Sequence, residues 1–198
     1  MSVKDQRGRL FVISSPSGGG KTTVVERLRQ QMPRLVRSVS VTTRPPRPGE
    51  RDGRDYQFIS RGTFQRLRRS GALLEWARVH GAYYGTPKRP IERALADGRD
   101  VILSIDVQGA RQIRRRFGHR AVLVFLRPPS MEQLRRRLMR RRTETSVAVR
   151  RRLAAAKREL ACSAWYDDTV VNDWLQRTMA RMRRILMAQR RDNERGTD

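Results

Sequence analysis

A glycine-rich run over residues 15–23 has the residue types and spacing that suit the binding of a phosphate chain. It reads Ser-Pro-Ser-Gly-Gly-Gly-Lys-Thr-Thr and lies between an apolar segment and a helical one. In such a loop, successive backbone N–H groups surround a phosphate, and the start of the following helix adds positive potential. Lys21 can bridge the β- and γ-phosphates, and the Thr22 hydroxyl can ligate Mg²⁺. The run therefore predicts a site for ATP with Mg²⁺.

The loop departs at one position from the pattern GxxxxGK[ST], because Ser15 stands where the first glycine belongs. Pro16 makes a strained glycine there less necessary. The alternative interpretation is an ordinary glycine-rich turn. The order of strand, glycine–lysine run and helix favours the phosphate-binding loop.

A second cluster of polar residues lies over residues 38–50, which read Ser-Val-Ser-Val-Thr-Thr-Arg-Pro-Pro-Arg-Pro-Gly-Glu. Arg44 and Arg47, three residues apart on a proline-stiffened loop, can clamp a dianionic phosphate. Further along, the carboxylate of Glu75 can accept both N1–H and the exocyclic amine of guanine, whereas adenine would leave it unpaired. Taken alone, Glu75 is better explained as a solvated strand residue. Together with the arginine loop and Tyr84, recognition of a guanine nucleotide is the stronger interpretation.

Alternating strands and helices must position these clusters. The hydrophobic pattern predicts strands at residues 9–14, 36–42, 56–59, 73–79, 100–105, 121–126 and 169–172. It predicts a loop at 43–55 and a turn at 81–85. It predicts helices at 21–32, 60–71, 86–98, 107–117 and 174–190, and two further helices between 130 and about 162 that are separated by a break at 143–146. Continuous apolar strands that alternate with helices indicate an α/β protein with a largely parallel sheet.

The composition narrows the class of protein further. The chain has 198 residues and a net charge of +26, with 45 basic residues. That charge suits nucleic-acid binding, but the arginines are spread over every predicted helix, so we interpret them as a compositional bias and do not expect a nucleic-acid partner. The apolar runs are too short to span a bilayer. The lone Cys162 and the polar N-terminus lead us to expect a protein of the reducing cytoplasm.

In combination, these motifs resemble the guanylate kinase family over residues 10–173. The resemblance rests on the two clusters above and on Tyr-Tyr-Gly-Thr at 83–86, Ile-Asp-Val-Gln-Gly-Ala at 105–110 and Val-Asn-Asp at 171–173. It implies one P-loop NTPase-type parallel sheet flanked by helices, with a small inserted GMP-binding subdomain and a helical lid. The expected bounds are about 8–37, 91–128 and 161–198 for the core, 38–90 for the insertion and 129–160 for the lid.

The resemblance also implies roles for single residues. The residues expected to bind ATP are Ser17, Gly18, Gly19, Gly20, Lys21, Thr22, Thr23, Arg137 and Asn172, the last two on the adenine side. Those expected to hold the GMP phosphate are Arg44, Arg47, Tyr56 and Tyr84, and those expected to read guanine are Ser40, Glu75, Thr86 and Asp106. Lys21 and two lid arginines, Arg141 and Arg152, are expected to neutralise the phosphoryl group during transfer.

Two positions depart from the family pattern. The lid, which usually reads Gly-Arg-Gly, here reads Arg-Arg-Arg over residues 140–142, and the loss of both glycines is expected to stiffen or move its hinge. Ser104 stands where the family usually has an aspartate that helps to organise Mg²⁺, which puts that role in doubt here.

The sequence thus predicts a kinase that transfers the γ-phosphoryl group of ATP to GMP, with Mg²⁺ as cofactor. Three alternatives stay open at this point. One is a catalytically weak module of the same fold that binds proteins, although such modules typically lose the loop lysine that this chain keeps. The others are a charge-driven nucleic-acid-binding protein and a P-loop kinase for another small phosphorylated acceptor. The sequence gives no oligomeric state.

Overall fold

The computed structural model of the chain describes residues 8–139 and 146–195. Its strands are β1 (Leu10–Ser14), β2 (Leu35–Arg37), β3 (Val41–Thr42), β4 (Gln57–Phe58), β5 (Leu73–Val79), β6 (Ala82–Pro87), β7 (Asp100–Ser104), β8 (Ala121–Arg127) and β9 (Asp168–Val171). Its α-helices are α1 (Lys21–Gln31), α2 (Arg61–Arg69), α3 (Lys88–Ala96), α4 (Val107–Phe117), α5 (Met131–Met139), α6 (Ser146–Ala161) and α7 (Leu175–Arg195). Two 3₁₀ turns follow α4 and α6, at Gly118–Arg120 and Cys162–Trp165.

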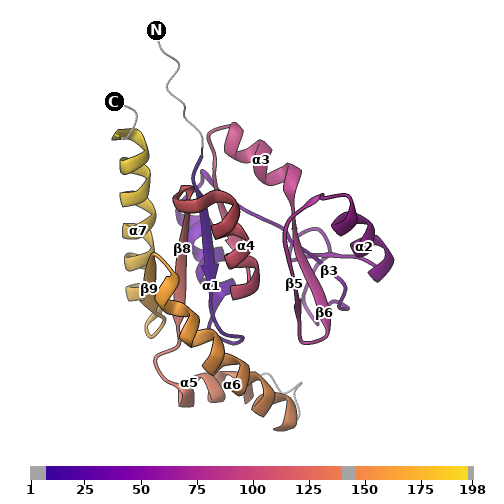
Figure 1. Cartoon of the computed structure of the whole chain (residues 1–198). Coiled ribbons are helices and arrows are strands. Elements are labelled where there is room, and N and C mark those ends of the chain that lie inside the picture. The colour runs from indigo at the N-terminus through magenta and orange to yellow at the C-terminus, as the bar shows by residue number, and fades with distance from the viewer. Residues whose placement is uncertain (1–7, 140–145, 196–198) are drawn as a thin grey trace.

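The main sheet has five parallel strands in the order β2-β7-β1-β8-β9, which confirms the predicted parallel α/β fold. Every residue of β1 is buried, because helices cover both faces. Leu10 and Val12 pack toward α3 and α4, whereas Phe11 and Ile13 pack toward α1 and α7. The carboxyl ends of the strands therefore meet at one edge, where Figure 1 shows α5 and α6 below β1 and β8.

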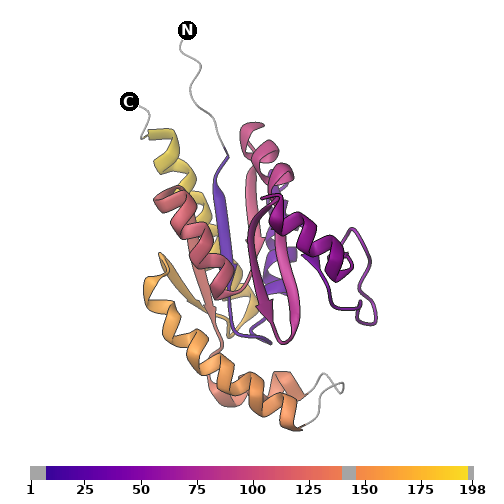
Figure 2. The ribbon, with the colours of Figure 1, turned by 45° about the vertical axis from the view of Figure 1, so that its right-hand side comes forward.

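A second sheet of four strands, in the order β4-β3-β6-β5, lies beside the first. Figure 2 brings it forward with α2 packed outside it, where Phe64 of α2 is buried with Val41 and Leu73. The hairpin of β5 and β6 is antiparallel, and its register pairs Glu75 with Thr86. Helix α2 begins after Ser60, whose hydroxyl accepts a hydrogen bond from the Thr63 N–H at 3.1 Å, as its sequence predicts.

Two predicted segments differ from the structure. The single strand expected at 36–42 is wrong, because the chain leaves the main sheet after Arg37 and enters the second sheet at Val41. The turn expected at 81–85 is also wrong. The reversal lies at His80 and Gly81, which both have positive φ, and β6 starts directly after it. Gly85 lies inside the strand, where an added Cβ would be 2.9 Å from a methyl of Leu73.

An ion-paired carboxylate fixes the last helix to the main sheet at the end opposite the phosphate-binding loop. Asp100, at the start of β7, accepts a hydrogen bond from the Arg9 N–H at 2.9 Å. Its other oxygen lies 3.1 Å from Nε of Arg190, near the end of α7. The pair joins β1, β7 and α7, so the layer formed by α1 and α7 is attached to the sheet by a polar contact as well as by its apolar face.

Candidate functional site

The phosphate-binding loop predicted at 15–23 connects β1 to α1 at the carboxyl edge of the main sheet. Gly18 and Gly20 have φ values of 86° and 94°, a region that favours glycine. The Gly19 N–H donates to the Pro16 carbonyl at 2.8 Å, which closes the turn ahead of the helix. Gly20 is the residue at which α1 begins, so the free N–H groups of its first turn border the loop. The sequence therefore builds a tight glycine turn that leads directly into the start of α1, where backbone N–H groups are free.

Lys21 lies across the mouth of this loop. Its ammonium group donates a hydrogen bond to the Ser15 carbonyl at 2.7 Å. Burial lowers the pKa of Lys21, and the negative charges of Glu159 and Asp106 act in the opposite direction. The Lys21 ammonium group is hydrogen-bonded to a neutral backbone carbonyl, and no salt bridge joins it to a carboxylate within the described residues. Its positive charge is therefore available for a ligand anion.

Two cavities open at this edge of the main sheet, and several polar side chains line both of them. The larger, about 270 Å³, lies over the loop and reaches the arginine cluster, with Thr22, Thr23, Ser38 and Asp55 in its wall. The smaller, about 170 Å³, runs toward the second sheet and ends at Glu75, Tyr84 and Asp106. The residues that line both are Ser15, Ser17, Lys21, Ser40, Arg44, Arg47, Tyr56 and Ser104. The structure thus brings the two predicted clusters to one continuous space.

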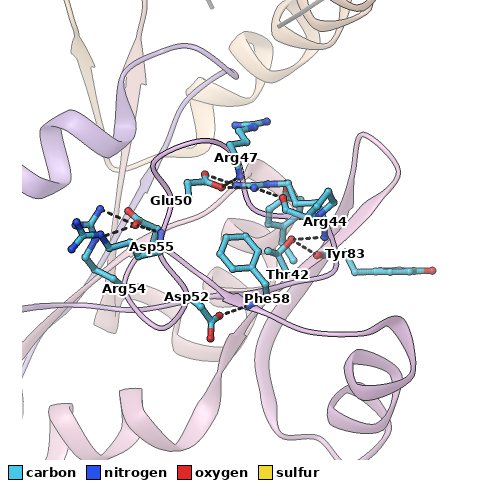
Figure 3. Close-up of polar contacts among 12 residues, drawn as sticks. Thr42, Arg44, Arg47, Glu50, Asp52, Arg54, Asp55, Phe58 and Tyr83 are labelled. Atoms are coloured by element: carbon cyan, nitrogen blue, oxygen red, sulfur yellow. Dashed lines mark hydrogen bonds and ion pairs between the residues drawn. The ribbon is translucent and has the colours of Figure 1, made fainter.

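The arginine cluster is held by a carboxylate that sequence reasoning did not select. Figure 3 shows Glu50 facing Arg44, with its oxygens 2.6 and 2.7 Å from the two terminal guanidinium nitrogens. Arg44 also donates to the Tyr84 hydroxyl at 3.1 Å and lies over the ring of Tyr56 at 5.0 Å. Burial works against the charges of both groups, but their mutual hydrogen bonds raise the pKa of Arg44 and lower that of Glu50.

Arg44 and Arg47 differ in how many donors they have left. Arg44 donates its Nε hydrogen to the Tyr84 hydroxyl and its two Nη1 hydrogens to Glu50 and the Pro45 carbonyl. With one Nη2 hydrogen also on Glu50, a single N–H is left. Arg47 contacts Glu50 through its backbone N–H at 2.8 Å, and its guanidinium has no hydrogen-bond acceptor within the ranges that the structure describes. Arg47 therefore presents the more available cation.

The far end of the smaller cavity is a buried carboxylate site. Glu75 is only 3% exposed and accepts a hydrogen bond from the Thr86 hydroxyl at 2.6 Å. Burial raises the pKa of Glu75 to about 7, and the nearby charge of Asp106 adds to the shift while Thr86 opposes it. Thr86 is fully buried and does not line either cavity, so it contacts Glu75 and not the open space.

Helix α4 fits closely against Glu75. Asp106 precedes the helix and accepts a hydrogen bond from the Gly109 N–H at 2.9 Å. An added Cβ on Gly109 would lie 2.2 Å from a Glu75 carboxylate oxygen, so any larger residue at that turn would force the carboxylate to shift. Gln112, one turn later, pairs with both backbone groups of Trp76, at 2.6 and 3.2 Å. These contacts set the distance between the second sheet and the core.

The arginines expected in the lid are placed in part. Arg152, on α6, donates to the Ser17 hydroxyl at 3.2 Å and lines the smaller cavity. Arg137, on α5, donates to the backbone carbonyl of Asn172 at 3.0 Å, at the end of β9. The prediction for Arg141 lies outside the described residues, as do the neighbouring positions 140 and 142.

Glu159 is a second carboxylate that sequence reasoning missed. It lies on α6 and lines the smaller cavity with Lys21, Asp106 and Arg152. Burial raises the pKa of Glu159, while the positive charge of Lys21 lowers it. A glutamate in an arginine-rich helix carries no local signal, because only the fold turns it toward the loop. Ser104, at the end of β7, lines both cavities, and the carboxylate charges that act on Lys21 are those of Glu159 and Asp106.

The described part of the chain has neither a helix that could span a membrane nor a side-chain cluster for a metal ion. None of its helices combines the length and apolarity required to cross a bilayer. Over the same residues, His, Cys, Asp and Glu side chains form no cluster of three or more that could hold a metal ion by themselves.

Comparison with known proteins gives one consistent family. The family model described as guanylate kinase matches residues 7–189. A guanylate kinase from Gloeobacter violaceus is 49% identical over 188 residues, covering 95% of this chain and 91% of its own, and one from Rubrobacter xylanophilus is 49% identical over 181 residues, covering 91% and 94%.

Solved structures agree with these relatives. A guanylate kinase from Anaplasma phagocytophilum superposes with a TM-score of 0.80 at 38% identity, covering 93% of this chain and 87% of that one. The SH3-kinase fragment of tight junction protein 3 matches at a TM-score of 0.52 and 14% identity, covering 94% and 59%, which is a likeness of fold alone.

Proposed function

Because the chain belongs to the guanylate kinase family, we propose a specific division of work among its residues. The reaction is the transfer of the γ-phosphoryl group of ATP to GMP, which gives ADP and GDP. The observation that carries the assignment of residues is the smaller cavity, which Lys21, Arg47 and Glu75 all line.

ATP binds with its phosphates in the loop of residues 15–23. The N–H groups around Gly18 and Gly20 and the first turn of α1 hold the β-phosphate, since the glycine turn leads directly into the start of the helix, where backbone N–H groups are free. Lys21 then exchanges its bond with the Ser15 carbonyl for phosphate oxygens. Ser17, Gly19, Thr22 and Thr23 complete this side. Arg137, which donates to the Asn172 carbonyl, lies with Asn172 on the adenine side.

GMP binds from the second sheet. Its phosphate lies against Arg47, the remaining N–H of Arg44, and the hydroxyls of Tyr56 and Tyr84. Its guanine reaches Glu75, whose carboxylate accepts the two adjacent donors N1–H and N2–H₂. Ser40 and Asp106 line the same cavity, whereas Thr86 acts through its hydrogen bond to Glu75. In this pose the acceptor phosphate points at the loop.

Phosphoryl transfer needs alignment and neutralisation of charge more than proton transfer, because the acceptor phosphate is already anionic. Lys21 and Arg152 border the space where the γ-phosphoryl group moves, and Arg141 joins them in the proposed mechanism. We assign residues 38–90 to GMP binding and 129–160 to a lid that excludes water when it closes. The core of the enzyme is then formed by residues 8–37, 91–128 and 161–198.

Mg²⁺ fits the donors on this edge. Thr22, Ser38 and Ser104 line the larger cavity with hydroxyl oxygens, and the buried Ser38 hydroxyl has no partner among the described residues. Oxygen donors are those that Mg²⁺ prefers, and it keeps several waters when it binds with nucleotide phosphates. Thr22 would hold the ion directly, and Asp106 and Glu159 would act through water. The ion would supply charge neutralisation at the β- and γ-phosphates.

Two alternative functions lack support of this kind. A protein-binding module has no use for the loop lysine, and Lys21 is present and faces the cavity. A nucleic-acid-binding protein has no use for a buried carboxylate such as Glu75. We propose the cytoplasm as the compartment of the enzyme, in keeping with its single free cysteine.

A coupled assay tests the assignment of the base-reading residue. ATP is offered with GMP, AMP, CMP or UMP, and ADP formation is followed for the wild type and for Glu75→Gln. For the wild type we expect turnover with GMP and none with AMP, CMP or UMP. In Glu75→Gln the KM for GMP should rise at least tenfold, since one charged hydrogen-bond acceptor is lost, with the KM for ATP little changed. Equal changes in both constants would show that Glu75 does not read the base.

A further inference from the structure

Asn172, expected at the adenine, is committed to the phosphate-binding loop. It follows β9, is 8% exposed, and its side-chain NH₂ donates to the Gly19 carbonyl at 2.7 Å. An added Cβ on Gly20 would lie 2.4 Å from the same nitrogen, so the amide and the loop are in close contact. The backbone of Asn172 accepts from Arg137 at 3.0 Å and donates to the Arg127 carbonyl at 2.7 Å. The side chain is therefore a brace between β9 and the loop.

A carboxamide can brace a carbonyl in only one of its two orientations. If the amide of Asn172 turned over, its oxygen would face the Gly19 carbonyl, and the two acceptors would repel each other. The acceptor-only Gly19 carbonyl thus favours the observed orientation, and a hydrogen bond at the other end of the amide adds to it. The Thr178 hydroxyl donates to Asn172 Oδ1 at 3.1 Å, and Thr178 is 1% exposed. Its second contact, to the Val171 carbonyl at 3.4 Å, is longer.

We propose that Thr178, on the first turn of α7, is a positioning residue for ATP binding. Its hydroxyl donates to Asn172 Oδ1 and so holds the amide in place with the NH₂ on the Gly19 carbonyl, and this keeps that carbonyl turned away from the phosphates. The loop N–H groups then stay directed at the ligand. Thr178 itself lines neither cavity, so it acts through Asn172 alone. The inference rests on the proposed binding of ATP by this loop.

Two substitutions at Thr178 separate its hydroxyl from its bulk. Thr178→Val keeps the shape but removes the donor, which leaves a buried Oδ1 unpaired. Thr178→Ser keeps the donor. Thr169→Val is the matched control, because Thr169 lies in β9 and its hydroxyl has no hydrogen-bond partner within the described residues.

The measurements are ADP affinity by titration calorimetry without GMP, and steady-state KM for both substrates. Thr178→Val should weaken ADP binding and raise the KM for ATP about tenfold, as expected for one buried hydrogen bond lost. The KM for GMP should stay within twofold. Thr178→Ser and Thr169→Val should match the wild type. Amide hydrogen exchange should speed up in the loop segment 17–21 of Thr178→Val and not in the controls.

Several results would overturn the inference. One is a Thr178→Val variant that binds ADP with normal affinity and shows unchanged amide hydrogen exchange in the loop. Another is an equal loss in Thr178→Ser, which would make the role one of packing alone. A third is an equal rise in the KM for GMP. If the wild type itself fails to phosphorylate GMP, the proposed function fails first, and that outcome is read from the untouched enzyme.

Discussion

Burial makes the base-reading carboxylate sensitive to pH. The pKa of Glu75 is raised to about 7, chiefly because the carboxylate has little contact with water and secondarily because Asp106 is near. Only the ionised form can accept both guanine donors. Below pH 7 the free enzyme must therefore release a proton before GMP binds.

The KM for GMP should accordingly rise about tenfold for each pH unit below 7 and be flat above it. The KM for ATP, measured in the same series, controls for phosphate ionisation and for general damage by acid. Glu75→Gln should lose the pH dependence of the KM for GMP. Parallel pH profiles for the two substrates would contradict this account.

Alanine variants of Arg44 and Arg47 should differ in their effect on folding stability. Arg44→Ala removes the partner of a half-buried Glu50 carboxylate and a ring contact, so it should cost roughly 1–3 kcal/mol of folding free energy. Arg47→Ala removes a guanidinium without such partners and should leave the melting temperature within a degree or two.

Both variants should raise the KM for GMP, and Arg47→Ala should do so at full stability. Thermal unfolding by calorimetry, read beside steady-state kinetics, distinguishes the two effects. An unchanged KM for GMP in the stable Arg47→Ala variant would remove Arg47 from the site.

At the scale of elements, the contact between α4 and β5 sets the depth of the base site. Gly109→Ala places a methyl group within 2.2 Å of a Glu75 oxygen and should raise the KM for GMP at least tenfold. Gly62→Ala in α2 is the matched control, since its nearest neighbour is 3.8 Å away. The control should gain up to about 1 kcal/mol of stability through helix propensity.

Kinetics and chemical denaturation of the two variants give the comparison. A Gly109→Ala enzyme with the wild-type KM for GMP would mean that Glu75 moves aside without consequence for base recognition.

The sequence was informative where a pattern is local. The strands that became β1, β7 and β8 are continuous apolar runs, buried on both faces, and they were predicted within a residue or two. The loop and Lys21 follow from a contiguous motif. The β2–β3 boundary could not be predicted, because residues 36–42 alternate smoothly although they belong to two sheets.

Partners from distant segments were the part of the site that the sequence concealed. Glu50 and Glu159 are ordinary acidic residues until the fold sets them beside Arg44 and Lys21. The expected place of Asn172 on the adenine side gave no sign that its amide also contacts Gly19 and Thr178. Such long-range hydrogen bonds leave no spacing signal along the chain.

For the whole molecule, the net charge of +26 should speed the capture of anionic nucleotides. The value of kcat/KM for GMP is expected to fall severalfold as NaCl rises from about 20 to about 200 mM, because the screening length shortens from roughly 20 Å to roughly 7 Å. Under saturating substrate, kcat should change little. Stopped-flow or steady-state data across this range give the answer, and a kcat/KM that is independent of salt would show that the surface arginines do not steer substrate.

The hydrogen bond from Asn172 to Gly19 spans 153 positions along the chain. A ribosome therefore makes the loop long before it makes the brace. A nascent chain that has not yet exposed residue 172 therefore holds the loop without its support, and nucleotide cannot stabilise it in this form. ATP should therefore begin to protect the chain from proteolysis only after β9 and the first turn of α7 have emerged from the ribosome.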